Sequence, residues 1–406
     1  MASQPLSYRM VLGLPGLRLL LAAMLLSRLA SRMLTLAIVL YALDRFQSPV
    51  IAGWLSFAAV APGLLVGPVA GAVLDRVGPV RGIAADMAAA AVLLLALAGL
   101  DGSGWSNPLA TGLIAVLLSL TSPLGAVGVR TLLPRLVPAD GIDRANGLDT
   151  AIWALVDATG PGLAGLIAGF VGVAPALVMI GGIYGLAGLT VSRVRYPAAV
   201  APARIRLLSH AAQGIRLVVF GPTLRGLAVS YSFYLAAWGI LVVAFPVQAV
   251  QSFPPGSAEA TAGLLWTGAG VAGGLSALLA GHLRTAGRER TVLVVAMALS
   301  APAIWPLCAE SGVAGLVAGL MLCGLLAGPV DVAVLTLRLR RTPTRDLERV
   351  LAVSMSVNQA GFPLGMALAG PLLTWSAPAA FAVAAGALVL AAITARFLIP
   401  ACDERS

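Results

Sequence analysis

The sequence has no lysine, only two histidines and only three cysteines, and each scarcity argues against a class of protein. Without lysine there is no phosphate-binding loop that ends in Lys-Ser or Lys-Thr, so direct use of ATP is not expected. Cys308, Cys323 and Cys402 lack metal-ligand spacing, so we expect neither a disulfide nor a metal site. His210 and His282 fall in or beside loops, too shallow in the membrane for a proton relay. No nucleophile and base converge, and we predict that the chain is not an enzyme.

Charge is also scarce, at 10% of residues, whereas 59% are hydrophobic and the mean hydropathy is +0.97. A chain of 406 residues with this composition cannot bury its apolar surface within one aqueous globule, so its solvent is expected to be lipid. The net charge of +10 could indicate nucleic-acid binding in a soluble domain. Here the arginines fall almost wholly in alternate loops, which reflects membrane topology, and no nucleic-acid partner is expected.

Apolar runs long enough to cross a bilayer recur along the chain, and they predict an all-α integral membrane protein with twelve transmembrane helices. The N-terminal run resembles a signal peptide but is long enough to span, so we expect it to be a permanent helix. The expected spans are 19–43, 50–74, 82–100, 108–133, 145–171, 174–192, 224–247, 260–283, 290–308, 312–337, 350–374 and 378–399.

The distribution of arginine predicts the orientation of the spans. Arginine is concentrated at both termini and in the connections that follow even-numbered spans, whereas Arg45 lies in an odd-numbered connection. Both termini are therefore expected in the cytoplasm, in a multi-pass protein of the bacterial cytoplasmic membrane. The acids Asp44, Asp101, Glu259 and Glu310 are expected on the outside, in agreement with this orientation.

The chain is expected to consist of two related halves. When residues 131–165 are moved forward by 205 positions, Arg135 falls on Arg340 and Arg144 on Arg349. We predict an N-terminal six-helix bundle over 1–192, a cytoplasmic linker with a surface helix over 193–223, and a C-terminal six-helix bundle over 224–406.

The connection between the second and third expected spans carries a recognisable motif. Gly71, Asp75, Arg76, Gly78 and Arg81 follow one another there, in a pattern that resembles the signature loop of the major facilitator superfamily. The resemblance implies that this loop takes part in gating between the two halves, although a simple solvated turn would also fit the sequence.

Two further motifs point to the same family. Gly160, Pro161 and Gly165 in the fifth span look like the Gly-Pro motif of its antiporter branches, in which a proline and small residues let a helix bend against its neighbours. The run 133–138, with the Arg-Ala-Asn-Gly sequence at 144–147, is similar to the branch that includes macrolide and enterobactin exporters. The resemblance covers essentially the whole chain and implies two six-helix bundles around a central cavity that opens alternately to each side.

Charged residues within the spans are candidates for the functional site, because each arginine costs about 2.5–3.5 kcal/mol at the bilayer centre. Arg28 and Arg32 lie on one face of the first span. Asp157 in the fifth span is the first-choice partner for this pair, Asp331 lies in the tenth span, and Asp149 is close enough to a helix end to be wet. We hypothesise that Asp157 or Asp331 takes up a proton during transport, the alternative being a permanent ion pair.

Polar and aromatic residues in the second half are candidates for solute contact. Tyr231, Tyr234 and Trp238 recur at helical spacing and could form an amphipathic wall, although such spacing also suits plain packing. Asn358 and Gln359 lie midway along the eleventh span and could bind solute or hydrogen-bond another helix.

These features predict a secondary active transporter that exports small amphiphilic compounds, antibiotics or secondary metabolites among them. We expect it to use the proton gradient and no cofactor, with the lipid bilayer, protons and a small-molecule solute as its partners, and to function as a monomer. Uptake or exchange of a nutrient, siderophore or lysolipid is an alternative, and a membrane receptor without transport activity is a second.

Overall fold

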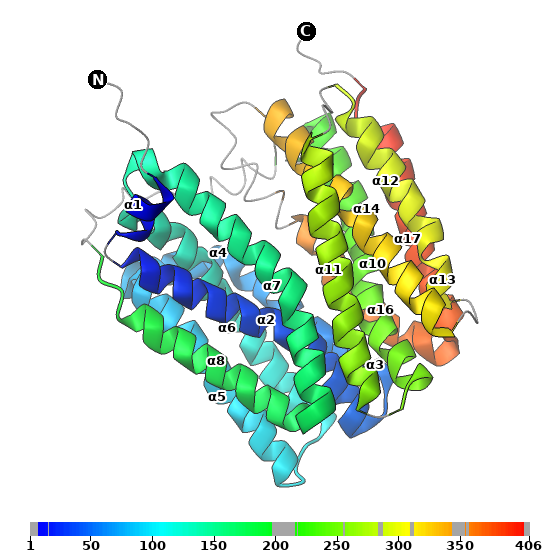
Figure 1. Cartoon of the computed structure of the whole chain (residues 1–406), viewed down its shortest axis with the longest axis horizontal. Coiled ribbons are helices and arrows are strands. Elements are labelled where there is room, and N and C mark those ends of the chain that lie inside the picture. Colours follow the sequence, from blue (N-terminus) through cyan, green and yellow to red (C-terminus); the bar gives the residue numbers. More distant parts are fainter. Residues whose placement is uncertain are drawn as a thin grey trace.

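The computed structural model describes residues 7–14, 16–196, 216, 218–254, 256–282, 287–308, 312–342, 354 and 357–401. Most of the expected linker, with its surface helix, lies outside these residues, as do His210, Glu310, Arg349 and Cys402. Figure 1 shows the described elements as helices packed in two groups, and no strand is present among them.

The helices follow the expected spans closely. The first group contains α1 (Tyr8–Leu12), α2 (Leu17–Phe46), α3 (Pro49–Ala58), α4 (Ala61–Val77), α5 (Pro79–Gly102), α6 (Pro108–Leu136), η1 (Ala139–Gly141), α7 (Ile142–Val171) and α8 (Val173–Ser192). The second contains α10 (Pro222–Ser252), α11 (Ser257–His282), α12 (Glu289–Ala303), α13 (Trp305–Cys308), α14 (Gly312–Arg341), α16 (Gly361–Trp375) and α17 (Ala377–Leu398).

Eleven stretches of the described chain are long and apolar enough to cross a membrane. The remaining expected span, 350–374, corresponds to α16, and part of that span lies outside the described residues. Large apolar side chains such as Leu65 and Phe170 are more than four-fifths exposed on the outer surface of the molecule, as expected where lipid is the solvent.

Local sequence explains where many helices begin. Proline occupies the first position of α3, α5, α6 and α10, where the missing N–H has no intrahelical partner to lose. Ser48, Asn107 and Ser376 cap the starts of α3, α6 and α17 by accepting a hydrogen bond from a backbone N–H three residues on. Gly78, with φ of +85°, joins α4 directly to α5.

The second expected span is broken into α3 and α4 at Ala59–Val60. Pro62 follows the break and has no N–H to donate to the preceding turn, so a continuous helix would lose a hydrogen bond there. The two segments differ in their neighbours: α3 packs against α16 of the second group in addition to α2 and α6 of its own, whereas α4 packs mainly against α6.

The helix ends lie on two faces. The arginine-rich face is the one at which α2 begins and α14 and α17 end, and the distal face is the one at which α2 ends and α3 begins. At the distal face Arg45 pairs with Asp101 at 3.3 Å, and the Tyr41 hydroxyl lies 2.5 Å from the Ser106 hydroxyl. Which face meets the cytoplasm stays a prediction from the arginine distribution.

The two groups meet near the distal face and diverge toward the arginine-rich face (Figure 1). Their main contact is between α7 and α11, and glycine makes it close. A Cβ atom added at Gly165 would lie 2.7 Å from Gly263 Cα, and one added at Gly263 would lie 2.6 Å from the Pro161 carbonyl oxygen. Along α11 this contact reaches Gly270, next to Asp157 and Ala158, where the cavity described below begins.

Gly165→Val is expected to weaken this contact, because the added side chain would displace the α11 backbone at a cost of about 1–3 kcal/mol. Gly182→Val in α8 is the matched control, since a Cβ atom there meets nothing within 4 Å. Thermal unfolding of the detergent-purified protein measures the difference. Equal effects of the two substitutions would contradict the close contact between α7 and α11.

Candidate functional site

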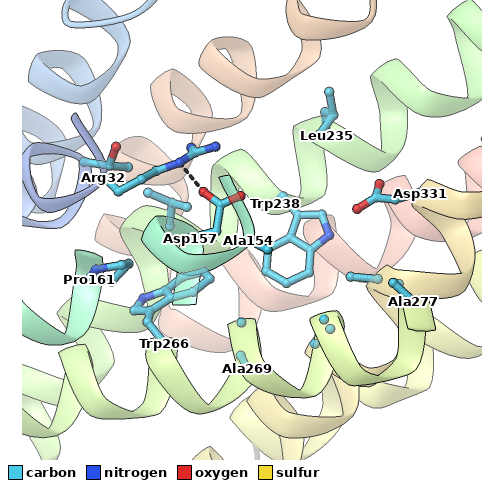
Figure 2. Close-up of a pocket in the computed structure, with 18 of the residues that line it drawn as sticks. Arg32, Ala154, Asp157, Pro161, Leu235, Trp238, Trp266, Ala269, Ala277 and Asp331 are labelled. Atoms are coloured by element: carbon cyan, nitrogen blue, oxygen red, sulfur yellow. Dashed lines mark ion pairs between the residues drawn. The ribbon is translucent and has the colours of Figure 1, made fainter. Parts of the chain in front are cut away.

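A cavity of about 430 Å³ lies between the two groups of helices (Figure 2). Six helices contribute to its wall: α2 and α7 from the first group, and α10, α11, α14 and α16 from the second. Its lining contains three charged side chains among the described residues, Arg32, Asp157 and Asp331. The rest is aromatic, aliphatic or glycine, apart from Thr35.

The first charged pair joins α2 to α7. Arg32 forms an ion pair with Asp157, as the sequence predicted, and Figure 2 shows the two side chains directed toward each other. Both are also open to the cavity, with side-chain exposures of 38% and 46%. Gly160 permits this approach, because a Cβ atom there would lie only 2.5 Å from Arg32 Cβ.

Arg28 has a different partner from the one expected. Its Nη2 lies 2.6 Å from Asp149 Oδ1, and its Nη1 donates to the Asp149 carbonyl oxygen at 3.2 Å. The expectation that Asp157 would serve both arginines is therefore wrong. Asp149 lies closer to the end of α7, but the long Arg28 side chain reaches it, and the pair is less exposed than the other, at 13% and 28%.

Trp153 links the two ion pairs. Its ring centroid lies 4.3 Å from Arg28 Cζ and 5.1 Å from Arg32 Cζ, both within cation–π range. Asp149, Trp153 and Asp157 follow at intervals of four along α7 and so share one helical face. That spacing is visible in the sequence, and together with the Arg28 and Arg32 spacing it was the signal that could have predicted the full set of contacts.

Asp331 on α14 lies on the opposite side of the Trp238 ring from Asp157 in the view of Figure 2. It accepts a hydrogen bond of 2.6 Å from the Tyr231 hydroxyl. Among the described residues no cation pairs with Asp331. The two carboxylates therefore differ: Asp157 is neutralised by an arginine, whereas Asp331 has a neutral partner.

An aromatic wall on the second group faces the carboxylates. Tyr231, Tyr234 and Trp238, singled out from the sequence, all line the cavity, and Trp266 of α11 extends their row. Ring centroids are 5.5 Å apart for Tyr231 and Tyr234, and 5.8 Å apart for Trp238 and Trp266. The sequence reasoning missed Trp266, because a lone aromatic in an apolar helix carries no periodic signal that gives its direction.

Asn358 and Gln359 do not line the cavity, in contrast to their expected role in solute contact. Asn358 is buried, and its amide accepts a hydrogen bond from Arg338 Nη2 at 2.7 Å and donates to the Ser354 carbonyl oxygen at 3.1 Å. It therefore serves helix-to-helix hydrogen bonding, the other role that the sequence allowed. Arg338 is itself almost fully buried, so this amide partly compensates a charge that water does not reach.

The signature-loop residues lie at the arginine-rich face, away from the cavity. Gly71, Asp75 and Arg76 belong to α4, Gly78 forms the turn, and Arg81 is in the first turn of α5. Asp75, Arg76 and Arg81 are exposed, and Asp75 makes no hydrogen bond or ion pair with any residue that the structure describes.

The Gly-Pro motif lies where α7 meets two other helices. Gly160 faces α2, Pro161 lines the cavity, and Gly165 faces α11 of the second group. The helix runs through Pro161 from Ile142 to Val171. The three residues thus connect the ion pair of the first group to the contact between the groups.

The sequence profile of the Major Facilitator Superfamily matches residues 20–258 and 227–405, and the chain belongs to this family of membrane transporters. Its fold is accordingly the all-α major facilitator fold. The chain is 49% identical to the uncharacterised MFS-type transporter y4rN of Sinorhizobium fredii over 395 residues, which are 97% of this chain and 98% of that one.

More distant similarities agree with this membership. The chain is 28% identical to the multidrug efflux pump Tap of Mycolicibacterium fortuitum over 341 residues, 78% of this chain and 79% of that one. A solved structure of a nucleoside transporter superimposes with a TM-score of 0.74 at 12% identity, covering 95% of this chain and all of the other. At that identity the structural likeness reports the fold alone.

The two ion pairs are expected to differ in strength. A double-mutant cycle with Arg28→Gln and Asp149→Asn should give a coupling free energy of about 1–2 kcal/mol, because this pair is mostly shielded from water. The cycle with Arg32→Gln and Asp157→Asn should give less than about 1 kcal/mol, because that pair is more exposed. Unfolding of the purified protein in detergent measures both. A stronger coupling for Arg32 and Asp157 would contradict this ranking.

Proposed function

We propose that the protein is a proton-coupled exporter of small amphiphilic compounds that works by alternating access. The observation that carries the proposal is the cavity with two carboxylates in unlike surroundings, Asp157 beside an arginine and Asp331 beside a tyrosine. The aromatic and aliphatic lining suits solutes that are largely apolar, and the similarity to multidrug efflux pumps supports the export direction.

The two carboxylates would couple solute to protons by exchange. A solute that enters from the arginine-rich face displaces protons from Asp157 or Asp331, and protons that arrive from the distal face later displace the solute. Arg32 controls the availability of Asp157, because a carboxylate that remains in its ion pair holds no proton. Release of that pair in one state is therefore required if Asp157 is the carrier.

The arginine distribution supports a location in the bacterial cytoplasmic membrane with both termini in the cytoplasm. In that orientation the described arrangement has its helix groups joined near the outer face and separated toward the cytoplasm. We propose the monomer as the functional unit, because the cavity is formed within one chain.

We also propose gating roles for the two family-like motifs. Asp75 would meet the second group when the arginine-rich face closes, and its exposure there without a described partner supports this role. Gly160, Pro161 and Gly165 would let α7 adjust against α2 and α11 at the same time.

Transport in proteoliposomes with an imposed pH gradient tests the coupling. Asp157→Asn and Asp331→Asn are each expected to lower proton-coupled flux at least about tenfold, equivalent to about 1.4 kcal/mol in the activation free energy. Asp140→Asn is the matched control, because Asp140 lies exposed in η1, away from the cavity.

Coupled flux that survives in the double Asn variant would contradict the role of these carboxylates. Accumulation of a labelled solute that moves with the protons, rather than against them, would favour uptake of a nutrient, siderophore or lysolipid. Absence of saturable flux across a broad panel of solutes would favour a receptor.

Asp75→Asn is expected to leave the unfolding temperature in detergent unchanged, because Asp75 makes no described contact in this arrangement, while slowing transport severalfold. Flux and thermal unfolding measured on the same preparation check both parts. A loss of stability without a loss of flux would show that Asp75 supports the turn rather than a gate.

A further inference from the structure

The cavity has more negative than positive charge. Arg32 and Asp157 neutralise each other, and Asp331 is left with the Tyr231 hydroxyl as its described partner. The nearest candidate for compensation on the same helix is Arg338, seven residues or about 10 Å along α14. Its guanidinium, however, donates to Asn358, and it does not line the cavity. A positively charged group on a solute would restore the balance.

A second feature of the same wall is an unused hydrogen-bonding group. Tyr234 is 2% exposed and lines the cavity, yet its hydroxyl oxygen makes no hydrogen bond of good geometry with a described residue, the Trp238 side chain being near enough only to interact with it. A buried hydroxyl without a partner costs about 1–3 kcal/mol, which a bound ligand can recover. The ring of Tyr234 stacks on that of Tyr231, whose own hydroxyl is on Asp331, so the unpartnered oxygen belongs to the same part of the cavity.

The third feature is the extended aromatic surface next to these two acceptors. Tyr234 and Trp238 have ring centroids 6.4 Å apart, and Trp266 continues the row. Aromatic faces attract cations and pack against flat apolar groups. A solute that places a cation at Asp331 can therefore lay an aromatic portion along Trp238 and Trp266.

From these three features we infer that the preferred solutes are monocations with a protonated amine and an aromatic group. The amine N–H groups donate to the Asp331 carboxylate and to the Tyr234 hydroxyl oxygen, while the aromatic group packs on Trp238 and Trp266. An anion would meet uncompensated negative charge at Asp331. This inference rests on the proposed function, since it names the solute of the same cavity, and it assigns Tyr234 a role in discrimination among cations.

Binding of three matched fluorescent probes tests the inference without any proton gradient. Dansylcadaverine carries an aromatic group and a primary ammonium, its N-acetyl derivative is neutral, and its N-trimethyl derivative keeps the charge but has no N–H at that nitrogen. Titration of the detergent-purified full chain, followed by energy transfer from tryptophan to dansyl, gives the affinity of each. The ammonium probe is expected to bind at least about tenfold more tightly than the acetylated one, equivalent to about 1.4 kcal/mol.

Variants locate the contacts. Asp331→Asn should abolish the preference for the ammonium over the acetylated probe, Asp331→Glu should retain much of it, and Asp140→Asn should not change it. Tyr234→Phe should weaken binding of the ammonium probe severalfold and leave the trimethylated probe unaffected. Size-exclusion profiles identify variants that fail to fold. If Asp331→Asn is among them, the conservative variants Asp331→Glu and Tyr234→Phe still decide whether the inference holds.

Equal affinity for the ammonium and acetylated probes would overturn the inference, as would an Asp331→Asn variant that still prefers the cation. An equal loss of both charged probes in Tyr234→Phe would overturn the role of the hydroxyl. Because binding is measured without a gradient, these outcomes are separate from coupled flux. Proton-driven export of neutral solutes would preserve the proposed function, whereas selective amine binding without flux would contradict it.

Discussion

The cost of charge inside a bilayer is the constraint on which the rest of this structure depends. Two guanidinium groups midway along α2 are tolerable only where acids and aromatic rings meet them, and a single face of α7 provides both. This fixes α2 against α7 and places Arg32 and Asp157 at the cavity. The same helix α7 also contacts α11, so it takes part both in the two ion pairs with α2 and in the main contact between the two helix groups.

The shared helix gives a physical route from the cavity to the rest of the molecule. Arg32 lies against Gly160, about one and a half turns before Gly165 and its close contact with α11. Helices that meet through glycine have little freedom to shift against each other, because their backbones are in direct contact and no side chain can rearrange. A single helix therefore connects the Arg32–Asp157 pair to the contact between the two groups.

The sequence was sufficient for the scaffold because hydropathy, proline and glycine act locally. The limits of α6, expected at 108–133 and observed at Pro108–Leu136, follow from a cap, a proline and an apolar run. The cavity was less accessible to sequence reasoning, because direction within a bundle depends on neighbouring helices. Asp149 was set aside on depth alone although a long arginine side chain reaches it, and Asn358 was considered for solute contact although Arg338 occupies it.

The break between α3 and α4 has a consequence for the surroundings of the protein. The α3 segment contacts α16 of the second group as well as α2 and α6 of the first, whereas α4 contacts helices of the first group, so a rocking motion between the groups would load the joint at Ala59–Val60. The α4 segment also presents Leu65 and Val69 to the acyl chains. A bend at this joint would move these side chains among the acyl chains, so the stiffness of the membrane would contribute to the free-energy difference between the two end states of the proposed transport cycle.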